Sequence, residues 1–415
     1  MVTRLGRVRV DGLGAPKRRQ LVNVLMLHNR YLIRGGEDES TDAEAVLLRE
    51  HGHEVDLFEM DNTGIAGGSL LQTGIDTVWS RGAYRAVRQK LQEKDYDLAH
   101  IQNFFPLFSP SVHYAIKDEC KPIVQSLRNY RLLCLNGLLF RAGGTCQDCV
   151  GKAVAWPGVL HGCYRESRAG SLVVASMLAT HRILRTWSRK VDVFLTSSEF
   201  ARGIFIEGGL CADKIAVKPN FVHPDPGPGA GQREYIVLVS RLTEEKGIQT
   251  VLEAWQRLVV SIPLKIVGDG PLAEVVNEAT RRMPWIENLG RRKLNEVYDL
   301  MGRARLALFP TELYETFGRV IIEAFAKGTP VLTSSMGSGS RLVHEGRTGL
   351  HYSARDPSDL AAKVRWAWEH PGECLEMGRA ARGEYEAKYT ADGNYPLLID
   401  AYEAAILRNR MSSPR

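Results

Sequence analysis

A chain of 415 residues is long enough to bury two substantial cores, because single domains typically hold about 100–200 residues. Hydrophobic residues make up 44% of it and charged residues 25%, which is ordinary for a folded protein and excludes a disordered or low-complexity chain. The formal net charge of +6 suits a phosphate-bearing ligand or an anionic surface, although an ordinary solvated surface carries such a charge too.

The first twenty residues are basic and contain no continuous apolar stretch, so we expect residues 1–20 to be a flexible leader. A secretory signal needs about 7–15 apolar residues after its basic start. A membrane-spanning helix needs about 18 or more, and no stretch of the chain reaches that length. We therefore expect a cytoplasmic protein, at most in contact with a membrane face. Seven cysteines in such a chain argue against a disulfide framework.

The first half alternates short apolar runs with segments of helical length. Residues 21–28 predict a buried first strand, a glycine turn follows at Gly35 and Gly36, and residues 43–50 predict a helix. Further strands are predicted at 51–58, 96–101, 121–127 and 191–196. This alternation is typical of a parallel sheet covered by helices on both faces, and we assign it to a first lobe spanning residues 21–221.

A change in composition separates this half from the next. Residues 221–231 contain three prolines and three glycines, which indicates a linker, placed at 222–233. Strands are predicted again at 235–240, 264–267, 306–309 and 330–333, in a second lobe of residues 234–390. Residues 394–408 have helical periodicity, and we expect the segment 391–415 to cross back to the first lobe. Two Rossmann-like α/β lobes place a cleft at the carboxyl ends of their strands.

Two loops of the second lobe have the residues of a phosphate site. Arg241 and Lys246 follow a predicted strand, and a planar guanidinium beside a point charge suits two adjacent phosphates. Gly268 and Gly270 follow the next strand, where glycine permits a tight turn and the close approach of a ligand. Taken alone, the first loop is also an ordinary charged connection, and the second lacks the third glycine of a dinucleotide-binding loop.

A third segment holds two glutamates, Glu315 and Glu323, eight positions apart. Eight residues are about two helical turns, so both carboxylates are able to share a helix face. Glu315 and Gly318 stand where a helix is expected to start, and the free N–H groups there favour an anion or sugar oxygens. Phe317 and Arg319 belong to the same start, and Glu323 is placed to accept two hydrogen bonds from a ribose diol. An amphipathic helix with two exposed acids is the alternative interpretation.

Together these three loops resemble those of the family-four retaining glycosyltransferases, and the likeness runs from residue 21 to about 406. The resemblance implies the GT-B fold and a nucleotide diphosphate sugar as donor, with a UDP-hexose favoured. It implies that Arg241 and Lys246 bind the diphosphate, that Glu323 binds the ribose, and that Glu315 contacts the transferred sugar. The backbone of Phe317 and Gly318 would contact that sugar as well.

The resemblance also implies a mechanism and a first-lobe contribution. In a front-face displacement the leaving phosphate takes the acceptor proton, and its charge is stabilised by Arg241 and Lys246, so no metal or other cofactor is required. Gly35 and Gly36 match the family's glycine loop over the phosphates. The acceptor would be a saccharide, a glycolipid or a secondary metabolite, with polysaccharide biosynthesis among the possible pathways, and no nucleic acid is implied.

The chain departs from the family pattern on the acceptor side. Gln102 and Arg128 stand where histidines are common, and neither is able to act as a base near neutral pH. His100 is open to two interpretations, as a residue of the acceptor side or as a core histidine. In the second lobe, residues 337–341 replace the common Gly-Gly-x-Pro-Glu. These changes leave two alternatives to a transferase: an inactive or regulatory nucleotide-sugar or carbohydrate-binding protein, and a sugar-nucleotide epimerase.

Four cysteines are concentrated in a predicted insertion at 134–163: Cys134, Cys146, Cys149 and Cys163. A Cys-x2-Cys pair flanked by two further thiols fits a closed, tetrahedral, structural zinc site. Four unligated, reduced cysteines are the alternative. Residues 171–190 and 81–90 are basic amphipathic stretches, which either lie on an anionic membrane or pack within their own domain.

Overall fold

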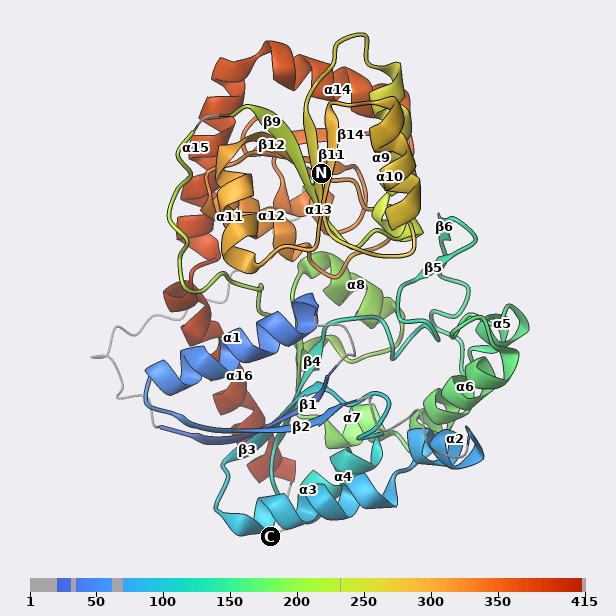
Figure 1. The fold of residues 1–415 in the computed structure, drawn as a ribbon. Coiled ribbons are helices and arrows are strands. Elements are labelled where there is room, and N and C mark those ends of the chain that lie inside the picture. The colour runs from blue at the N-terminus through green and yellow to red at the C-terminus, as the bar shows by residue number, and fades with distance from the viewer. Residues whose placement is uncertain (1–20, 31–34, 62–69, 232, 413–415) are drawn as a thin grey trace, which may run out of the picture.

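The computed structural model describes residues 21–30, 35–61, 70–231 and 233–412, and the basic leader 1–20 lies outside them. Two α/β lobes lie one above the other, each built on a six-stranded parallel sheet (Figure 1). This confirms the expected fold of two Rossmann-like lobes. Among the described residues, no helix is long and apolar enough to cross a membrane.

The sheet of the first lobe has the strand order β2-β1-β3-β4-β7-β8. The strands are β1 (Asn23–Arg30), β2 (Glu54–Asp61), β3 (Leu98–Asn103), β4 (Ile123–Leu127), β7 (Val193–Thr196) and β8 (Ile215–Val217). Its helices are α1 (Gly36–Glu50), α2 (Leu70–Val78), α3 (Arg81–Glu93), α4 (Ser111–Asp118), α5 (Trp156–Leu160), α6 (Arg168–Ile183), α7 (Thr186–Lys190) and α8 (Glu199–Glu207), with a short turn of 3-10 helix, η2 (Ala212–Lys214). The small hairpin of β5 (Phe140–Arg141) and β6 (Gly144–Thr145) stands apart from the sheet.

The sheet of the second lobe has the order β11-β10-β9-β12-β13-β14. Its strands are β9 (Tyr235–Val239), β10 (Leu264–Val267), β11 (Ile286–Gly290), β12 (Ala304–Phe309), β13 (Val331–Ser334) and β14 (Gly349–Tyr352). The helices are η3 (Glu244–Lys246), α9 (Ile248–Arg257), α10 (Ala273–Arg282), α11 (Leu294–Arg303), α12 (Arg319–Ala326), α13 (Gly339–Leu342), α14 (Pro357–Glu369) and α15 (Pro371–Lys388). Between β8 and β9 the described chain forms only an isolated bridge, from Val222 to Thr390.

Both faces of each sheet are buried, which explains why the strands read as continuous apolar runs. In β1, Leu25 and Leu27 enter one core, while Val24 and Met26 enter the core on the opposite face. The last helix, α16 (Ala391–Ser412), completes this second core with side chains that include Leu398, Tyr402 and Ala405. Figure 1 shows α16 running down from the upper lobe along the lower sheet. The expected crossing helix is therefore confirmed.

Some boundaries differ from those expected. The helix α1 starts at Gly36 rather than at residue 43, because Asp38 caps its first turn. Strands β8, β11 and β14 were not predicted: β8 has only three residues, and β11 and β14 have polar residues in their interior, Glu287 and Asn288 in β11 and His351 in β14. The stretch 171–190 is divided between α6 and α7, where Arg185 takes a left-handed conformation with φ of 55°. Arg182 donates hydrogen bonds to the carbonyl groups of Leu132 and Ala153, at 3.0 and 3.3 Å, so this basic side chain packs within its own lobe.

Candidate donor and acceptor site

The loop after β9 brings Arg241 and Lys246 to the carboxyl end of the second sheet. The Arg241 side chain is 65% exposed and lies 3.6 Å from Oε1 of Glu245. Lys246 ends η3, and Gly247 then turns the chain into α9 with φ of 69°. A Cβ at Gly247 would lie 2.1 Å from the carbonyl oxygen of Pro310, so only glycine allows this turn to pack against the neighbouring loop.

Gly268 and Gly270 pack against the backbone of this loop. A Cβ at Gly268 would lie 1.8 Å from the oxygen of Ser240, and one at Gly270 would lie 2.6 Å from the oxygen of Leu242. The amide of Leu242 donates to the oxygen of Asp269 at 2.9 Å. The two glycines thus permit close packing between two loops. Close approach of a ligand to them stays a prediction.

The third segment forms a loop followed by a helix, and its two glutamates do not share a helix face. Gly318 is the N-cap of α12 with φ of 110°, as expected for a helix start, but Glu315 lies before it in the loop. The expectation of a common face is therefore wrong: α12 begins at Arg319, directly after the left-handed Gly318, so Glu315 does not belong to the helix that contains Glu323. Ser338, at the start of α13, donates to the carbonyl of Phe317 and holds this loop in place.

One ion pair joins two of the three loops, and a second lies within α12. The Nζ of Lys246 contacts Oε1 of Glu315, and each side chain is 19% exposed. Arg319 pairs with Glu323 one turn further along α12, at 2.7 Å. The guanidinium of Arg319 also donates to the hydroxyl of Ser40 at 3.3 Å, across the boundary between the lobes. Cations and carboxylates thus alternate along the amino end of α12, where a helix favours anionic groups.

Further hydrogen bonds join the lobes beside Glu315. The hydroxyl of Thr316 donates to the carbonyl of Arg128 at 2.9 Å. The hydroxyls of Ser197 and Ser198, which follow β7, both donate to the carbonyl of Thr316, at 3.1 and 2.6 Å. Because these bonds are made by the residue next to Glu315, this loop of the second lobe is held directly against the first lobe.

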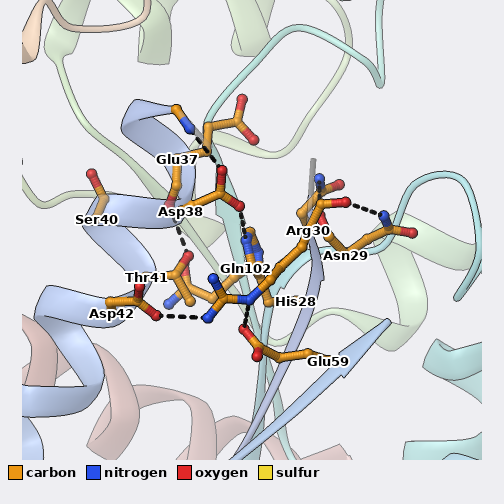
Figure 2. A network of polar contacts seen from close by, with 12 residues as sticks. His28, Asn29, Arg30, Glu37, Asp38, Ser40, Thr41, Asp42, Glu59 and Gln102 are labelled. Carbon is orange, nitrogen blue, oxygen red and sulfur yellow. Dashed lines mark hydrogen bonds and ion pairs between the residues drawn. The ribbon is translucent and has the colours of Figure 1, made fainter. Parts of the chain in front are cut away.

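The predicted glycine loop lies at the start of α1. Apart from the chain neighbours and the helix's own backbone, no atom of the described residues lies within 4 Å of the position of a Cβ at Gly35 or Gly36, so a ligand is able to approach this backbone closely. The amide of Gly35 already donates to Oδ2 of Asp38 at 2.9 Å. Oδ1 of Asp38 lies 2.8 Å from Nε2 of His28, and both side chains are buried. Figure 2 shows Asp38 reaching from α1 to His28.

Gln102 and Arg128 belong to a buried network around Glu44, whose side chain is 1% exposed. Arg128 donates to Oε1 of Glu44 at 2.9 Å and to Oε1 of Gln102 at 2.7 Å. Lys218 lies 2.7 Å from the same carboxylate, and Gln102 donates to it at 2.6 Å. Burial would raise the pKa of Glu44, but the charges of Lys218 and Arg128 outweigh it and hold that pKa well below its usual range.

Gln102 and Arg128 also line a small pocket at the ends of β3 and β4, together with Asn129 and Arg131. His100 does not reach it. Its side chain is 0% exposed, Nδ1 hydrogen-bonds with the hydroxyl of Tyr402 at 2.8 Å, and Nε2 with the hydroxyl of Ser126 at 2.9 Å. Burial lowers the pKa of His100 to about 3. These contacts favour the core interpretation of His100 over a role on the acceptor side.

Sequence reasoning missed Glu44, Lys218 and Tyr130. The first two are ordinary charged residues until the fold buries them together. Tyr130 is 1% exposed, and its hydroxyl has no hydrogen-bond partner among the residues that the structure describes. Burial, followed by the charge of Glu315, raises the pKa of this tyrosine, which places its hydroxyl near the Lys246–Glu315 pair. The one feature of the sequence that could have indicated Tyr130 is its position two residues after Arg128.

The four clustered cysteines come together around one cavity, which Arg141 and Asp148 also line. All seven cysteines of the protein are free thiols. Over the described residues, no group of three or more His, Cys, Asp and Glu side chains is placed to hold a metal ion as it stands.

The sequence of the second lobe matches a known family, the group 1 glycosyl transferases, over residues 233–370. A glycogen synthase of Mycobacterium tuberculosis is 31% identical over 194 residues, which are 45% of this chain and 46% of that protein. The D-rhamnosyltransferase WbpZ of Pseudomonas aeruginosa is 32% identical over 161 residues, 38% of this chain and 42% of that protein. The matched segment thus covers less than half the length of these relatives.

The fold has close counterparts among solved structures. The crystal structure of Anabaena Alr3699/HepE in complex with UDP and glucose superposes with a TM-score of 0.68 at 16% identity, over 92% of this chain and 100% of that one. A sucrose-phosphate synthase from Thermosynechococcus elongatus superposes with a TM-score of 0.67 at the same identity, over 94% and 98% of the two chains. The protein therefore has the GT-B fold, and the sequence of its second lobe is similar to that of the group 1 glycosyl transferases.

Proposed function

We propose that the protein is a retaining glycosyltransferase that moves a hexose from a nucleotide diphosphate sugar, with a UDP-sugar favoured, onto an acceptor bound by the first lobe. The observation that carries the proposal is the Lys246–Glu315 ion pair, which stands next to the exposed guanidinium of Arg241. The two cations suit a diphosphate, and the neighbouring carboxylate suits the hydroxyl groups of a sugar, so the three side chains together fit a nucleotide sugar. The match to the group 1 family and the UDP-bound structural neighbour support it.

In this proposal the bound donor takes the place of contacts that the charged side chains make with one another in the unliganded protein. The diphosphate binds Arg241 and draws Lys246 away from Glu315, which then accepts a hydroxyl of the transferred sugar. The backbone of Phe317 and Gly318 contacts the same sugar. Glu323 accepts the two hydroxyls of the ribose, while Arg319 keeps its carboxylate charged and oriented. The open backbone at Gly35 and Gly36 leaves room for the phosphates on the side of the first lobe.

The chemical step follows from these positions. The acceptor hydroxyl attacks the anomeric carbon on the face from which the diphosphate leaves, so the configuration is retained. The bond between that carbon and the phosphate oxygen breaks, and the departing phosphate takes the acceptor proton. Arg241 and Lys246 stabilise the charge that develops on the diphosphate, which is usually the largest contribution in such sites. We therefore propose transfer without a catalytic divalent cation, which a rate that is unchanged by added magnesium or manganese would support.

The acceptor is proposed to enter over the pocket lined by Gln102 and Arg128. Neither side chain is able to act as a base near neutral pH, because an amide is not basic and a guanidinium group has no free acceptor for a proton. This favours the leaving phosphate as the proton acceptor. A saccharide, a glycolipid and a secondary metabolite remain the proposed acceptor classes. Peripheral membrane contact is the accompanying proposal, and flotation with liposomes that contain anionic lipid tests it.

A thermal-shift panel of nucleoside diphosphates and their sugars tests the donor site. A ligand at 100 times its dissociation constant adds about 2.7 kcal/mol to the stability. One nucleotide is expected to shift the wild-type protein, with much smaller shifts for Arg241→Ala and Glu323→Ala. If no nucleotide shifts the wild type, the proposal fails.

The fixed pairing of Arg128 with Glu44 also favours a second candidate, a protein that binds the nucleotide sugar without transferring it, because the acceptor side then lacks a movable polar group. Incubation with the donor that the panel identifies separates the two. Donor hydrolysis or transfer excludes the binding protein. Donor that stays intact in the presence of every acceptor class supports it.

A further inference from the structure

The segment that contains the four clustered cysteines has little regular structure of its own. Between β4 and α6 it forms only the two-residue strands β5 and β6 and the short helix α5. Leu139, Ala142 and Arg165 have positive φ angles of 52°, 49° and 52°, which side-chain-bearing residues rarely adopt. Such a conformation persists only when the surroundings hold it in place.

The cluster is nevertheless compact. Cys134 comes from the turn before the hairpin, Cys146 and Cys149 follow it, and Cys163 follows α5, yet all four line the same cavity. The three other cysteines, Cys120, Cys211 and Cys374, do not line it. Four thiols that line one cavity from separate turns supply the ligand set of a structural tetrahedral site, two of them from a Cys-x2-Cys pair, once their side chains turn toward one ion.

We propose that these four cysteines bind one zinc ion with no catalytic role. Each thiol gives its proton to solvent as the sulfur bonds to the ion, so four protons leave and a site with a net charge of −2 forms. The guanidinium of Arg141, which lines the cavity, offsets part of that charge. The Sγ of Cys134 now donates to Oδ1 of Asn136 at 3.0 Å, so zinc binding turns this side chain away from its present partner.

The proposed zinc site lies beside a hairpin that contacts the second lobe. The turn of the β5–β6 hairpin reaches the second lobe, where a Cβ at Gly143 would lie 3.2 Å from Oε1 of Glu244 and one at Gly144 would lie 3.4 Å from the guanidinium of Arg355. Glu244 begins η3, the short helix that ends at Lys246. The zinc therefore fixes a first-lobe hairpin against the loop that carries the diphosphate-binding lysine. This last step rests on the proposed function, whereas the metal site does not.

Metal content and cobalt spectroscopy test the site independently of activity. Protein expressed with zinc and purified without chelator is expected to hold one ion per chain. The variant with Cys146→Ser and Cys149→Ser is expected to lose it, while Cys120→Ser with Cys211→Ser, which alters two exposed thiols, retains it. Cobalt in place of zinc is expected to give intense thiolate-to-metal charge-transfer absorption in the wild type. Removal of the metal is expected to expose four further thiols to a chromogenic reagent.

Absence of both zinc and the cobalt band in the wild-type protein, with the cluster thiols freely reactive, would overturn the proposal, even if the serine variant fails to fold. Undiminished metal in the serine variant would overturn it as well. A nucleotide shift in the thermal panel that persists without metal leaves the donor site intact, so the two proposals fail separately.

Discussion

Lys246 and Glu315 form an ion pair between two loops that are separated by 69 residues in the chain. Lys246 ends the first short helix after β9, and Glu315 lies in the loop before α12. Both side chains are largely buried, so their mutual attraction is screened less than that of a surface pair. A ligand that binds Lys246 must compete with Glu315, and this makes the pair a sensitive probe of the proposed donor site.

Replacement of Lys246 by methionine is expected to lower the turnover number by about 10²–10³-fold, because the charge on the leaving diphosphate loses one stabilising cation. Steady-state kinetics with the donor that the thermal panel identifies measure the effect. Lys363→Met is the matched control, since Lys363 also pairs with a glutamate, at 3.1 Å, but on the outer side of the second lobe. Equal turnover in the two variants would exclude a catalytic role for Lys246.

Glu323→Gln is expected to weaken binding of the nucleoside diphosphate by about ten- to a hundredfold, because a hydrogen bond to a charged group contributes about 1.5–3 kcal/mol. Isothermal titration with the nucleotide alone measures it. Glu278→Gln is the control, because Glu278 likewise pairs with an arginine, Arg282, but this pair lies on the exposed face of α10. The idea of a ribose contact fails if Glu323→Gln binds the nucleotide as tightly as this control does.

Tyr130→Phe is expected to leave the unliganded protein at least as stable as the wild type, since a buried hydroxyl without a partner costs about 1–3 kcal/mol. It is expected to weaken binding of the sugar nucleotide more than binding of the diphosphate, because the hydroxyl lies near Glu315. Thermal unfolding and titration with both ligands test this. Tyr84→Phe, which removes a hydroxyl bonded to Asp118 on the surface, is the control. A large loss of stability in Tyr130→Phe would mean that the hydroxyl has a structural partner.

His100 makes the stability depend on pH. Its pKa is lowered to about 3 in the folded protein, against about 6.5 when unfolded, so both states are neutral above pH 7 and the effect there is zero. As the pH falls below 6.5, only the unfolded state takes up the proton, and stability is lost by about 1.4 kcal/mol per unit until the folded pKa is reached. Between pH 6.5 and 5 this amounts to about 2 kcal/mol.

The variant His100→Gln, which keeps polar atoms near Tyr402 and Ser126, is expected to lack this part of the acid sensitivity. Denaturant unfolding at pH 7, 6 and 5 compares it with the wild type and with His344→Gln, whose ring is partly exposed. If His100→Gln and the wild type lose stability in parallel, His100 does not stay neutral in the folded state.

The sequence by itself determined the alternation of strands and helices, the division into two lobes and the crossing helix. These are local properties, since apolar runs of strand length and segments of helical periodicity report burial on both faces of a sheet. It also predicted the loops of the proposed donor site, because Arg241 and Lys246 follow a predicted strand and Glu315 and Glu323 stand around the expected start of a helix. Short strands such as β8 and β14 escaped, because three or four residues carry too little periodicity.

Only the tertiary structure decided how these residues interact. The pairing of Lys246 with Glu315, the burial of Glu44 between Arg128 and Lys218, and the core position of His100 all join segments far apart in the chain. The left-handed Gly318 likewise removed Glu315 from the helix that the spacing to Glu323 had indicated. Spacing along the chain fixes neighbours within a helix or strand, whereas contacts between loops depend on how two separate sheets and their helices pack.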